Sequence, residues 1–454
     1  MAAHIVVIGG GISGLSAAYD VNRLLPDAQV TVLEREPRWG GKILSETVAL
    51  PDGGACLIEG GAESFVTRKP EVWDLVHELG IADQIRLAPN AANGTCVLDE
   101  GRIRRIPLDP VTFLTTGLLS PAGKARMLLE PLIAARRDAG DESLADFVDR
   151  RLGREARERF IGPVLGGIYN TDPELQSLLT TAPIMRELER HGSLIWGSMV
   201  RMWERRSAPR RPAFISFNHG TQALTDGLAA AFGGTLRVGV TAEALSRQGG
   251  RWQIATSEGA PTLSADAVIF TTPANVAASL LAEVAPAAAA LLRTIHHNHI
   301  GTLSLIYRDA DLPRLNLSGL MIPRRERRAI DAITRFHAPN PRVPEGYTLL
   351  KVFFGGGDPR TAELDEPTLL ERVGRELDAL LAIKAQPVAW RAYRWHSAFP
   401  QAAVGHLDLV DDIEAALPAG LFVAGAAFRG IGVPDCIRQA RAVAGRLAQP
   451  FLKR

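Results

Sequence analysis

Three glycines near the start of the chain have the spacing of a pyrophosphate-binding turn. Gly9, Gly11 and Gly14 follow the β-branched run at residues 5–8 and precede residues 15–25, whose apolar spacing predicts a helix. In a strand–turn–helix unit these glycines permit a tight turn and the close approach of a pyrophosphate, and the helix start attracts the phosphates. The stretch therefore predicts dinucleotide binding, with a glycine-rich turn in an unrelated α/β protein as the alternative.

A carboxylate and a second pair of glycines follow this turn. A predicted second strand ends at Glu34, about 20 positions after Gly14, where an acid that binds ribose hydroxyls belongs. Arg38, Gly40 and Gly41 come next. This R-x-G-G spacing resembles that of glutathione-reductase-like flavoproteins, whose glycines let the chain pass along the FAD pyrophosphate. No second G-x-G-x-x-G opens a later predicted helix, so we expect something other than NAD(P)H to reoxidise the flavin.

Two later glycine segments are predicted to complete the cofactor site. Residues 58–65 have the pattern of a strand end and a glycine turn, and residues 420–448 that of a strand, a glycine loop and a helix beginning near Pro434. The start of this last helix can face the electron-rich edge of a flavin. Residues 214–232 and 265–274 return the chain to the same domain, which is therefore predicted to be discontinuous.

Composition and charge restrict the class of protein. The chain has 454 residues, 46% hydrophobic and 22% charged, with a formal net charge of +1, so we expect two or three domains and no nucleic-acid partner. Its three cysteines form no metal-binding spacing and indicate a reduced, cytoplasmic context. The apolar run at residues 274–292 contains Asn275, Glu283 and Pro286, so no transmembrane helix is expected.

A helix-rich insert is predicted between residues 107 and 191. Residues 110–137 combine leucines with lysine and arginine at helical spacing. We favour a helix that packs within its domain and exposes a charged face. A basic amphipathic helix at a membrane surface is the alternative.

Seven motifs together resemble one family. They occur in the order expected for the oxygen-dependent porphyrinogen oxidases of haem biosynthesis and span nearly all of residues 4–450: GGGISGLSAAY, GAESF, GGIYNTDPELQS, LERHGSLIWG, TTPA, WHSAFPQAAVGH and FRGIGVPDCIRQ. The segments RGIGVPDCI and GGIY are more specific than the glycine turn. The resemblance implies FAD-dependent oxidation of protoporphyrinogen or coproporphyrinogen III within the amine-oxidase-like flavoprotein superfamily.

The predicted fold is α/β (α+β), with a discontinuous Rossmann-like FAD-binding domain of the glutathione-reductase type, an inserted mixed-sheet substrate domain and a helical insert. We expect the FAD-binding domain at residues 1–78, 214–285 and 415–454, the substrate-binding domain at residues 79–106, 192–213 and 286–414, and the helical insert at residues 107–191. A membrane-facing position of the insert is left open.

The resemblance also implies which residues hold the cofactor and the substrate. The FAD-contacting positions correspond to Gly9, Gly10, Gly11, Ile12, Ser13, Gly14, Glu34, Arg35, Gly40, Gly41, Lys42, Gly61, Ala62, Glu63, Ser64, Ala242, Trp395, Ala426, Ile431, Gly432 and Val433. The substrate cavity corresponds to Gly167, Leu320, Met321 and Phe353. No residue is assigned as an acid or base catalyst.

Departures from the family pattern concern the substrate site. Residues 170–171, Asn-Thr, stand where the family often has small residues. Residues 94–95, Gly-Thr, stand where it often has a basic residue that binds a propionate. Arg102, Arg104 and Arg105 are candidates to replace that basic residue.

A histidine pair and a basic run carry weaker signals. His297 and His299 share one face of a predicted strand and could present two metal ligands, but no further ligands cluster nearby, so no metal is predicted. Residues 323–330, PRRERRAI, are interpreted as a solvated turn. Attraction of propionates or of a membrane surface is the alternative.

The implied reaction removes six electrons and six protons from a porphyrinogen. A flavin accepts two electrons as a hydride, so we expect three cycles with O2, each releasing H2O2. The expected task of the protein is to hold a meso carbon of the substrate over the flavin N5. The lack of a membrane-inserting segment and the arginine-rich strands favour coproporphyrinogen over protoporphyrinogen. An amine oxidase, a carotenoid desaturase and a catalytically silent flavin-binding protein are the alternatives.

The expected partners are the porphyrinogen and O2. A homodimer, peripheral contact with the inner face of the membrane and transient contact with a ferrochelatase are left open. The protein is expected in the cytoplasm.

Overall fold

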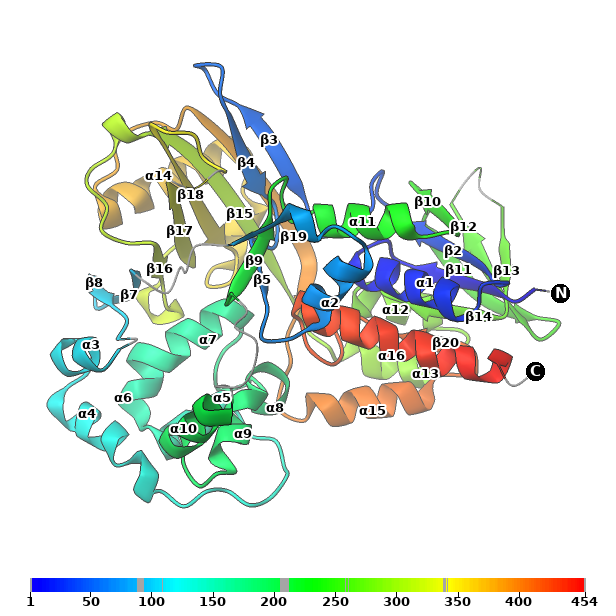
Figure 1. Ribbon diagram of the computed structural model, residues 1–454, viewed down its shortest axis with the longest axis horizontal. Coiled ribbons are helices and arrows are strands. Elements are labelled where there is room, and N and C mark those ends of the chain that lie inside the picture. The colour runs from blue at the N-terminus through cyan, green and yellow to red at the C-terminus, as the bar shows by residue number, and fades with distance from the viewer. Residues whose placement is uncertain are drawn as a thin grey trace.

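The computed structural model describes residues 2–87, 94–107, 109–204, 212–257, 259, 261–337, 340 and 342–452. Figure 1 shows three groups of elements: a parallel sheet between helices on the right, a large mixed sheet on the upper left and a cluster of helices on the lower left. Both ends of the chain lie at the right, beside the parallel sheet.

The parallel sheet forms from continuous apolar runs that are buried on both faces. All five residues of β1 (His4–Ile8) are buried. The strand order is β10 (Thr235–Val238), β2 (Gln29–Glu34), β1, β14 (Ala267–Phe270) and β20 (Leu421–Val423). Distant parts of the chain share this one sheet, which confirms the predicted discontinuous Rossmann-like fold.

Two helices cover one face of the parallel sheet. They are α1 (Ile12–Leu24) and α16 (Val433–Leu452). Ala17 of α1 and Ala444 of α16 are buried in one core with Ile5 and Val7 of β1. Because alanine side chains are small, the two helices pack directly on each other.

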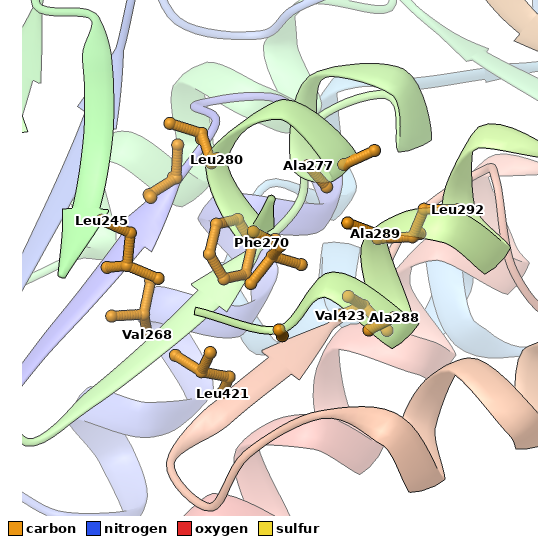
Figure 2. Close-up of a cluster of buried hydrophobic side chains, with 14 of the residues drawn as sticks. Leu245, Val268, Phe270, Ala277, Leu280, Ala288, Ala289, Leu292, Leu421 and Val423 are labelled. Atoms are coloured by element: carbon orange, nitrogen blue, oxygen red, sulfur yellow. The ribbon is translucent and has the colours of Figure 1, made fainter. Parts of the chain in front are cut away.

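The opposite face of the sheet is covered by a small antiparallel sheet and two helices. The elements are β11 (Ala242–Gln248), β12 (Arg251–Thr256), β13 (Leu263–Ala265), α12 (Ala274–Leu281) and α13 (Pro286–Arg293). Figure 2 shows Val268 and Phe270 of β14 within this core, beside Leu245. The predicted hairpin joins β11 to β12 through Gly249 and Gly250, whose φ angles are 58° and 81°.

The mixed sheet has seven strands and joins segments far apart in the sequence. Its order is β19 (Ala389–Pro400), β15 (His297–Arg308), β18 (Tyr347–Phe354), β17 (Ala332–His337), β16 (Gly319–Met321), β7 (Thr95–Asp99) and β8 (Arg102–Arg105). The helix α14 (Glu366–Leu381) packs on one face with Leu369, Val373 and Leu377.

Several smaller elements belong to neither of the two large sheets. They are the hairpin β3 (Ser45–Ala49) and β4 (Ala55–Glu59), the sheet of β5 (Phe65–Val66), β9 (Phe214–Phe217) and β6 (Ile85–Leu87), and the helices α2 (Glu71–Glu78), α11 (Ala223–Ala231) and α15 (His406–Ala416).

The helical group consists of short helices. They are α3 (Pro110–Thr115), α4 (Pro121–Leu128), α5 (Leu144–Arg151), α6 (Arg154–Ala156), α7 (Gly162–Tyr169), α8 (Leu178–Thr181), α9 (Pro183–Glu189) and α10 (Leu194–Glu204). The helix favoured for residues 110–137 is divided, because Asp109 and Ser120 each cap a new helix. Neither α3 nor α4 buries a described residue. The domain limits stay predictions.

The part of the chain that the structure describes contains no helix long and apolar enough to cross a membrane.

Candidate active site

Two glycine segments approach each other at the carboxyl end of β1. The N–H of Gly40 donates to the carbonyl oxygen of Gly10 at 2.8 Å, and Gly11 and Gly40 form a β-bridge. A Cβ on Gly41 would lie 3.2 Å from the Cα of Gly11. The backbone is thus free of side chains here, which lets a pyrophosphate approach the start of α1.

The first turn excludes side chains for a structural reason at two of its glycines. Gly9 has a φ of 110°, and a Cβ there would lie 2.7 Å from the Oγ1 of Thr271. A Cβ on Gly14 would lie 1.8 Å from the carbonyl oxygen of Gly9. A Cβ on Gly11 would meet nothing closer than 3.9 Å. Gly11 therefore has free space where a side chain would stand, and a ligand can occupy this space.

Glu34 ends β2 with its carboxylate turned back toward the first turn. It is buried and accepts hydrogen bonds from the N–H groups of Gly10 at 2.7 Å and Glu36 at 2.9 Å. Arg38 fixes the second glycine loop, because its guanidinium donates to the carbonyl oxygen of Gly41 at 2.5 Å. The acid and the two glycine segments are thus held as one unit.

The start of α16 lies beside the same unit. The Sγ of Cys436 donates to the carbonyl oxygen of Ile431 at 3.9 Å. Asp435, in the first turn, accepts from Lys69 and Arg438 at 2.5 Å each. The Cys436 contact ties the loop that leads from β20 to the first turn of the helix, and Lys69 holds this turn from outside the helix. The helix N-terminus therefore has a defined position.

A cavity of about 700 Å³ lies where the three groups of elements meet. Its wall includes Lys42, Gly60, Gly61, Ala62, Ala426 and Ile431 from the nucleotide-binding half, Gly162, Pro163, Gly166 and Gly167 from α7, and Gly301, Met321, Phe353, Trp395 and Phe399 from the mixed sheet. In Figure 1, α7 lies between the helical group and the mixed sheet. The size and the glycine-rich, apolar wall are typical of a site for a bulky small molecule.

The loop at residues 59–64 borders this cavity. Side chains from other parts of the chain donate hydrogen bonds to five consecutive backbone carbonyl groups of this loop. The Nζ of Lys351 donates to the carbonyl oxygens of positions 59 and 61 at 2.7 and 2.9 Å. Trp395 Nε1 donates to position 60 at 3.1 Å, Thr221 Oγ1 to position 62 at 3.0 Å and Arg342 Nη2 to position 63 at 2.6 Å. The loop therefore has a single fixed conformation beside the cavity.

A buried network of ion pairs lies behind this loop. Glu63 pairs with Lys351 at 2.5 Å and with Arg342, and Arg342 lies 3.2 Å from Glu59. Burial raises the pKa of Glu59, and the charge of Arg342 opposes this shift. Lys351 was not recognised in the sequence as a site residue. The available signal was a lysine inside the apolar strand β18, since lysine is rarely buried without a partner.

Lys42 projects into the cavity without a partner among the described residues. Enclosure by the surrounding protein lowers the pKa of its ammonium group, and Cys436 opposes the shift. Lys42 is therefore available to an anionic part of a bound molecule.

The structure brings three of the four predicted substrate residues to one wall. A Cβ on Gly167 would lie 3.6 Å from the Sδ of Met321, and Phe353 lines the same cavity. The prediction for Leu320 is corrected, because its side chain is fully buried in the core beneath α14. Side chains alternate along a strand, so Gly319 and Met321 face the cavity and Leu320 faces the core.

The remaining predicted cofactor residues occupy separate places. Ile12 begins α1, Ala242 begins β11 and Trp395 lines the cavity. Arg35 is exposed and pairs with Glu36 at 3.1 Å. Their contacts with a cofactor stay predictions.

The predicted histidine pair is not assembled as two ligands. The Nδ1 of His299 lies 3.3 Å from that of His396, and the Nδ1 of His297 lies 2.9 Å from the carbonyl oxygen of Ile295. Within the described ranges no group of three or more histidine, cysteine, aspartate or glutamate side chains could hold a metal ion.

The arginines proposed as substitutes for a propionate-binding base do not contribute to the cavity wall. Arg104 instead pairs with Asp99 at 3.2 Å. The arginines that do line the cavity are Arg157, Arg324 and Arg325. The first precedes α7 and the other two belong to the basic run at residues 323–330.

Comparison with known families decides what kind of protein this is. The model of the flavin-containing amine oxidoreductases matches residues 12–448. The chain belongs to this family. Membership in the flavin-containing amine oxidoreductases confirms the predicted FAD cofactor and fits the glycine segments, the buried Glu34 and the helix start described above.

Individual relatives of this flavin-containing amine oxidoreductase agree with the motif resemblance. A coproporphyrinogen III oxidase of Bacillus subtilis (strain 168) is 32% identical over 97% of this chain and 96% of its own. A chloroplastic protoporphyrinogen oxidase of Nicotiana tabacum is 30% identical over 99% of this chain and 86% of its own. The structure of a candidate protoporphyrinogen oxidase from Exiguobacterium sp. 255-15 superposes with a TM-score of 0.84 at 26% identity, over 99% of both chains. The predicted resemblance is confirmed.

Proposed function

We propose that this chain is an FAD-dependent oxidase that converts a porphyrinogen to the porphyrin in haem biosynthesis. The observation that carries the proposal is the cavity of about 700 Å³, which is bordered by the FAD-binding segments and walled by glycine and apolar residues. A tetrapyrrole is large and mostly apolar, so such a wall suits its ring. The porphyrinogen oxidases among the relatives support the same assignment.

The residues present fit FAD. The glycines of the first turn and the second loop would bind the pyrophosphate, and Glu34 would bind the ribose. Lys42 would bind an anionic part of the cofactor. The loop at residues 59–64 and the start of α16 would lie beside the ring system. Bound FAD would supply the hydride acceptor, and O2 the final acceptor with release of H2O2. Three rounds account for six electrons.

The protein's own contribution is position and exclusion of water. No side chain is assigned as acid or base, because aromatisation makes the porphyrinogen easy to oxidise. Gly167 leaves the wall opposite Met321 free of a side chain, so the ring can approach. It lies in the last turn of α7, where the carbonyl groups carry partial negative charge and would stabilise positive charge on the ring.

We favour coproporphyrinogen III, with four carboxylates, over protoporphyrinogen, with two. The arginines on the cavity wall and the coproporphyrinogen III oxidases among the relatives support this preference.

We further propose peripheral membrane contact through the helical group of a cytoplasmic protein. Its support is a patch on α10 and the adjoining turn η2 (Glu130–Leu132), which we call the apolar patch. The patch consists of the exposed side chains Leu129, Leu132, Ile195, Trp196, Met199, Met202 and Trp203. Tryptophan and methionine at such a surface suit the boundary of a bilayer.

A homodimer and transient contact with a ferrochelatase are additional proposals that follow only from the family resemblance.

The decisive experiment is anaerobic mixing of the yellow holoenzyme with each porphyrinogen while the visible flavin band is followed. Faster bleaching by the four-carboxylate compound assigns a coproporphyrinogen oxidase, and the reverse ranking assigns protoporphyrinogen. No bleaching by either contradicts the proposal and favours an amine oxidase, a desaturase or a silent flavin-binding protein.

A further inference from the structure

Four cationic side chains contribute to the cavity wall. Lys42 belongs to the nucleotide-binding half, whereas Arg157 lies in η3 (Arg157–Ile161), and Arg324 and Arg325 lie in η6 (Arg324–Glu326). The three arginines therefore form a basic part of the wall outside the FAD-binding segments.

Two of these arginines are engaged by carboxylates of the protein. Arg157 donates to Asp149 at 2.8 Å. Arg325 donates to Asp99 at 2.6 Å and also to the carbonyl oxygen of Glu158. Arg157 is thus held within the helical group, and Arg325 joins that group to the mixed sheet, so both are poorly placed to bind a ligand.

Arg324 differs from its neighbours. It is exposed at the cavity and forms no ion pair with a described carboxylate. Its guanidinium makes one hydrogen bond to the described residues, from Nη2 to the carbonyl oxygen of Asn170 at 3.3 Å. A guanidinium has five N–H donors, so most of its donors remain available.

The acids of the same wall are occupied elsewhere. Glu158 accepts from Arg154 at 2.5 Å, and Asp172 accepts from the N–H of Glu174 at 3.1 Å. Asp331 accepts from the N–H groups of Gly356 and Gly357 at 2.7 and 2.6 Å. Burial raises the pKa of Asp331, and the two backbone N–H groups and the nearby charge of Arg324 oppose this shift. Asp331 and Arg324 form no ion pair. The positive charge of Arg324 is thus not neutralised by a direct contact.

The turn that carries Arg324 is fixed by the two residues that follow it. Arg325 is tied to Asp99, and Glu326 accepts from the N–H groups of Glu100 and Gly101 at 2.8 and 3.1 Å. Since the neighbouring residues hold the turn against β7 and β8, Arg324 is presented to the cavity from a rigid base.

We propose that Arg324 is a specificity-determining residue that binds one carboxylate of the substrate. The inference rests on the proposed function and extends it, because it assigns the basic group that residues 94–95 lack. A planar guanidinium can bind a carboxylate through two parallel hydrogen bonds, while the glycine and apolar wall receives the ring.

The test uses the FAD-loaded full chain and coproporphyrin III, the stable oxidised ring with four carboxylates. Binding is followed by porphyrin fluorescence. Arg324→Gln is expected to raise the Kd about 10- to 100-fold, the range for a hydrogen-bonded charged pair. Arg324→Lys should have a smaller effect because it keeps the charge. Arg327→Gln, which removes the same charge from the same basic run but off the cavity wall, should change the Kd less than about two-fold.

Two further readouts separate a carboxylate anchor from a structural role. The tetramethyl ester of the same porphyrin should bind equally to wild type and Arg324→Gln. In anaerobic mixing, Arg324→Gln should raise the half-saturating porphyrinogen concentration while leaving the limiting bleaching rate within about three-fold of wild type.

The outcomes distinguish the inference from the proposed function. Equal loss of binding in Arg324→Gln and Arg327→Gln, or the same loss with the ester, would overturn the carboxylate anchor. So would failure of wild type to bind coproporphyrin III. Arg324-dependent binding without any flavin bleaching would keep the carboxylate site and overturn the oxidase.

Discussion

Lys351 is a fully buried lysine in the middle of strand β18, and its contacts explain its position. Its ammonium group binds two carbonyl oxygens of the loop at residues 59–64 and the carboxylate of Glu63. Lys351→Met would leave these groups buried without that partner. We expect the free energy of unfolding to fall by about 3–5 kcal/mol, the cost of breaking a buried ion pair.

The measurement is denaturant unfolding of the FAD-loaded variant, together with FAD retention on dialysis. Lys384→Met is the matched control, because Lys384 is exposed and its replacement should change stability by less than about 0.5 kcal/mol. Equal stability and FAD retention in the two variants would contradict the role of Lys351 as a positioning residue.

Gly167 offers a test of the cavity that does not disturb the fold. A Cβ there would make an ordinary contact with Met321 at 3.6 Å, and alanine within a helix is more stable than glycine by about 0.5–1 kcal/mol. Gly167→Ala should therefore fold at least as well as wild type. Its added methyl group should obstruct the ring and lower kcat/KM for the porphyrinogen about ten-fold.

Gly374→Ala in α14 is the control for Gly167→Ala. A Cβ on Gly374 meets nothing within 4 Å, and the residue lies away from the cavity wall. Thermal unfolding should show both variants at or above wild type, and steady-state kinetics should separate them. Full activity of Gly167→Ala would show that the ring does not approach α7 at this point.

At the scale of elements, the apolar patch makes a prediction about the helical group. Trp196, Met199 and Trp203 are 57%, 51% and 69% exposed, so their replacement should not disturb the core. If the patch contacts a bilayer, the triple variant Trp196→Gln, Met199→Gln and Trp203→Gln should reduce the vesicle-bound fraction at least about ten-fold, since each large apolar side chain contributes about 1.5–3 kcal/mol when buried.

The measurement is co-sedimentation with phosphatidylcholine–phosphatidylglycerol vesicles. The double variant Leu87→Gln and Leu175→Gln is the control, because these leucines are 66% and 63% exposed outside the patch. No sedimentation of wild type, or an equal loss in both variants, would refute membrane contact through α10.

Elements formed by neighbouring residues were predictable from the sequence, and long-range pairings were not. The turn at Gly9, the strand ending at Glu34 and the hairpin at Gly249 each depend on local spacing, and the structure contains all three. Leu320 was placed on the wrong face because the sequence does not reveal which side of β16 meets α7. The role of Lys351 depends on a loop about 290 positions away in the chain, so no local pattern predicts it.

At the scale of the whole molecule, the three described cysteines lie in three different regions. Cys56 lies in β4, Cys96 in β7 of the mixed sheet and Cys436 in α16 beside the cofactor segments. All three are free and buried. Burial raises the pKa of Cys56 to about 12 and that of Cys436 to about 11. The thiols should therefore react only when their own region opens.

A thiolate-specific disulfide reagent at pH 8 can follow this opening residue by residue. Denatured protein should react at all three cysteines, whereas the FAD-loaded protein should react slowly at each, because the reactive thiolate is scarce and enclosed. Removal of FAD should accelerate labelling of Cys436 more than that of Cys56 or Cys96, since Cys436 bonds Ile431 next to the predicted cofactor position. Peptide mass spectrometry assigns each label. Equal acceleration at all three cysteines would instead mean that FAD stabilises the molecule as a single cooperative unit.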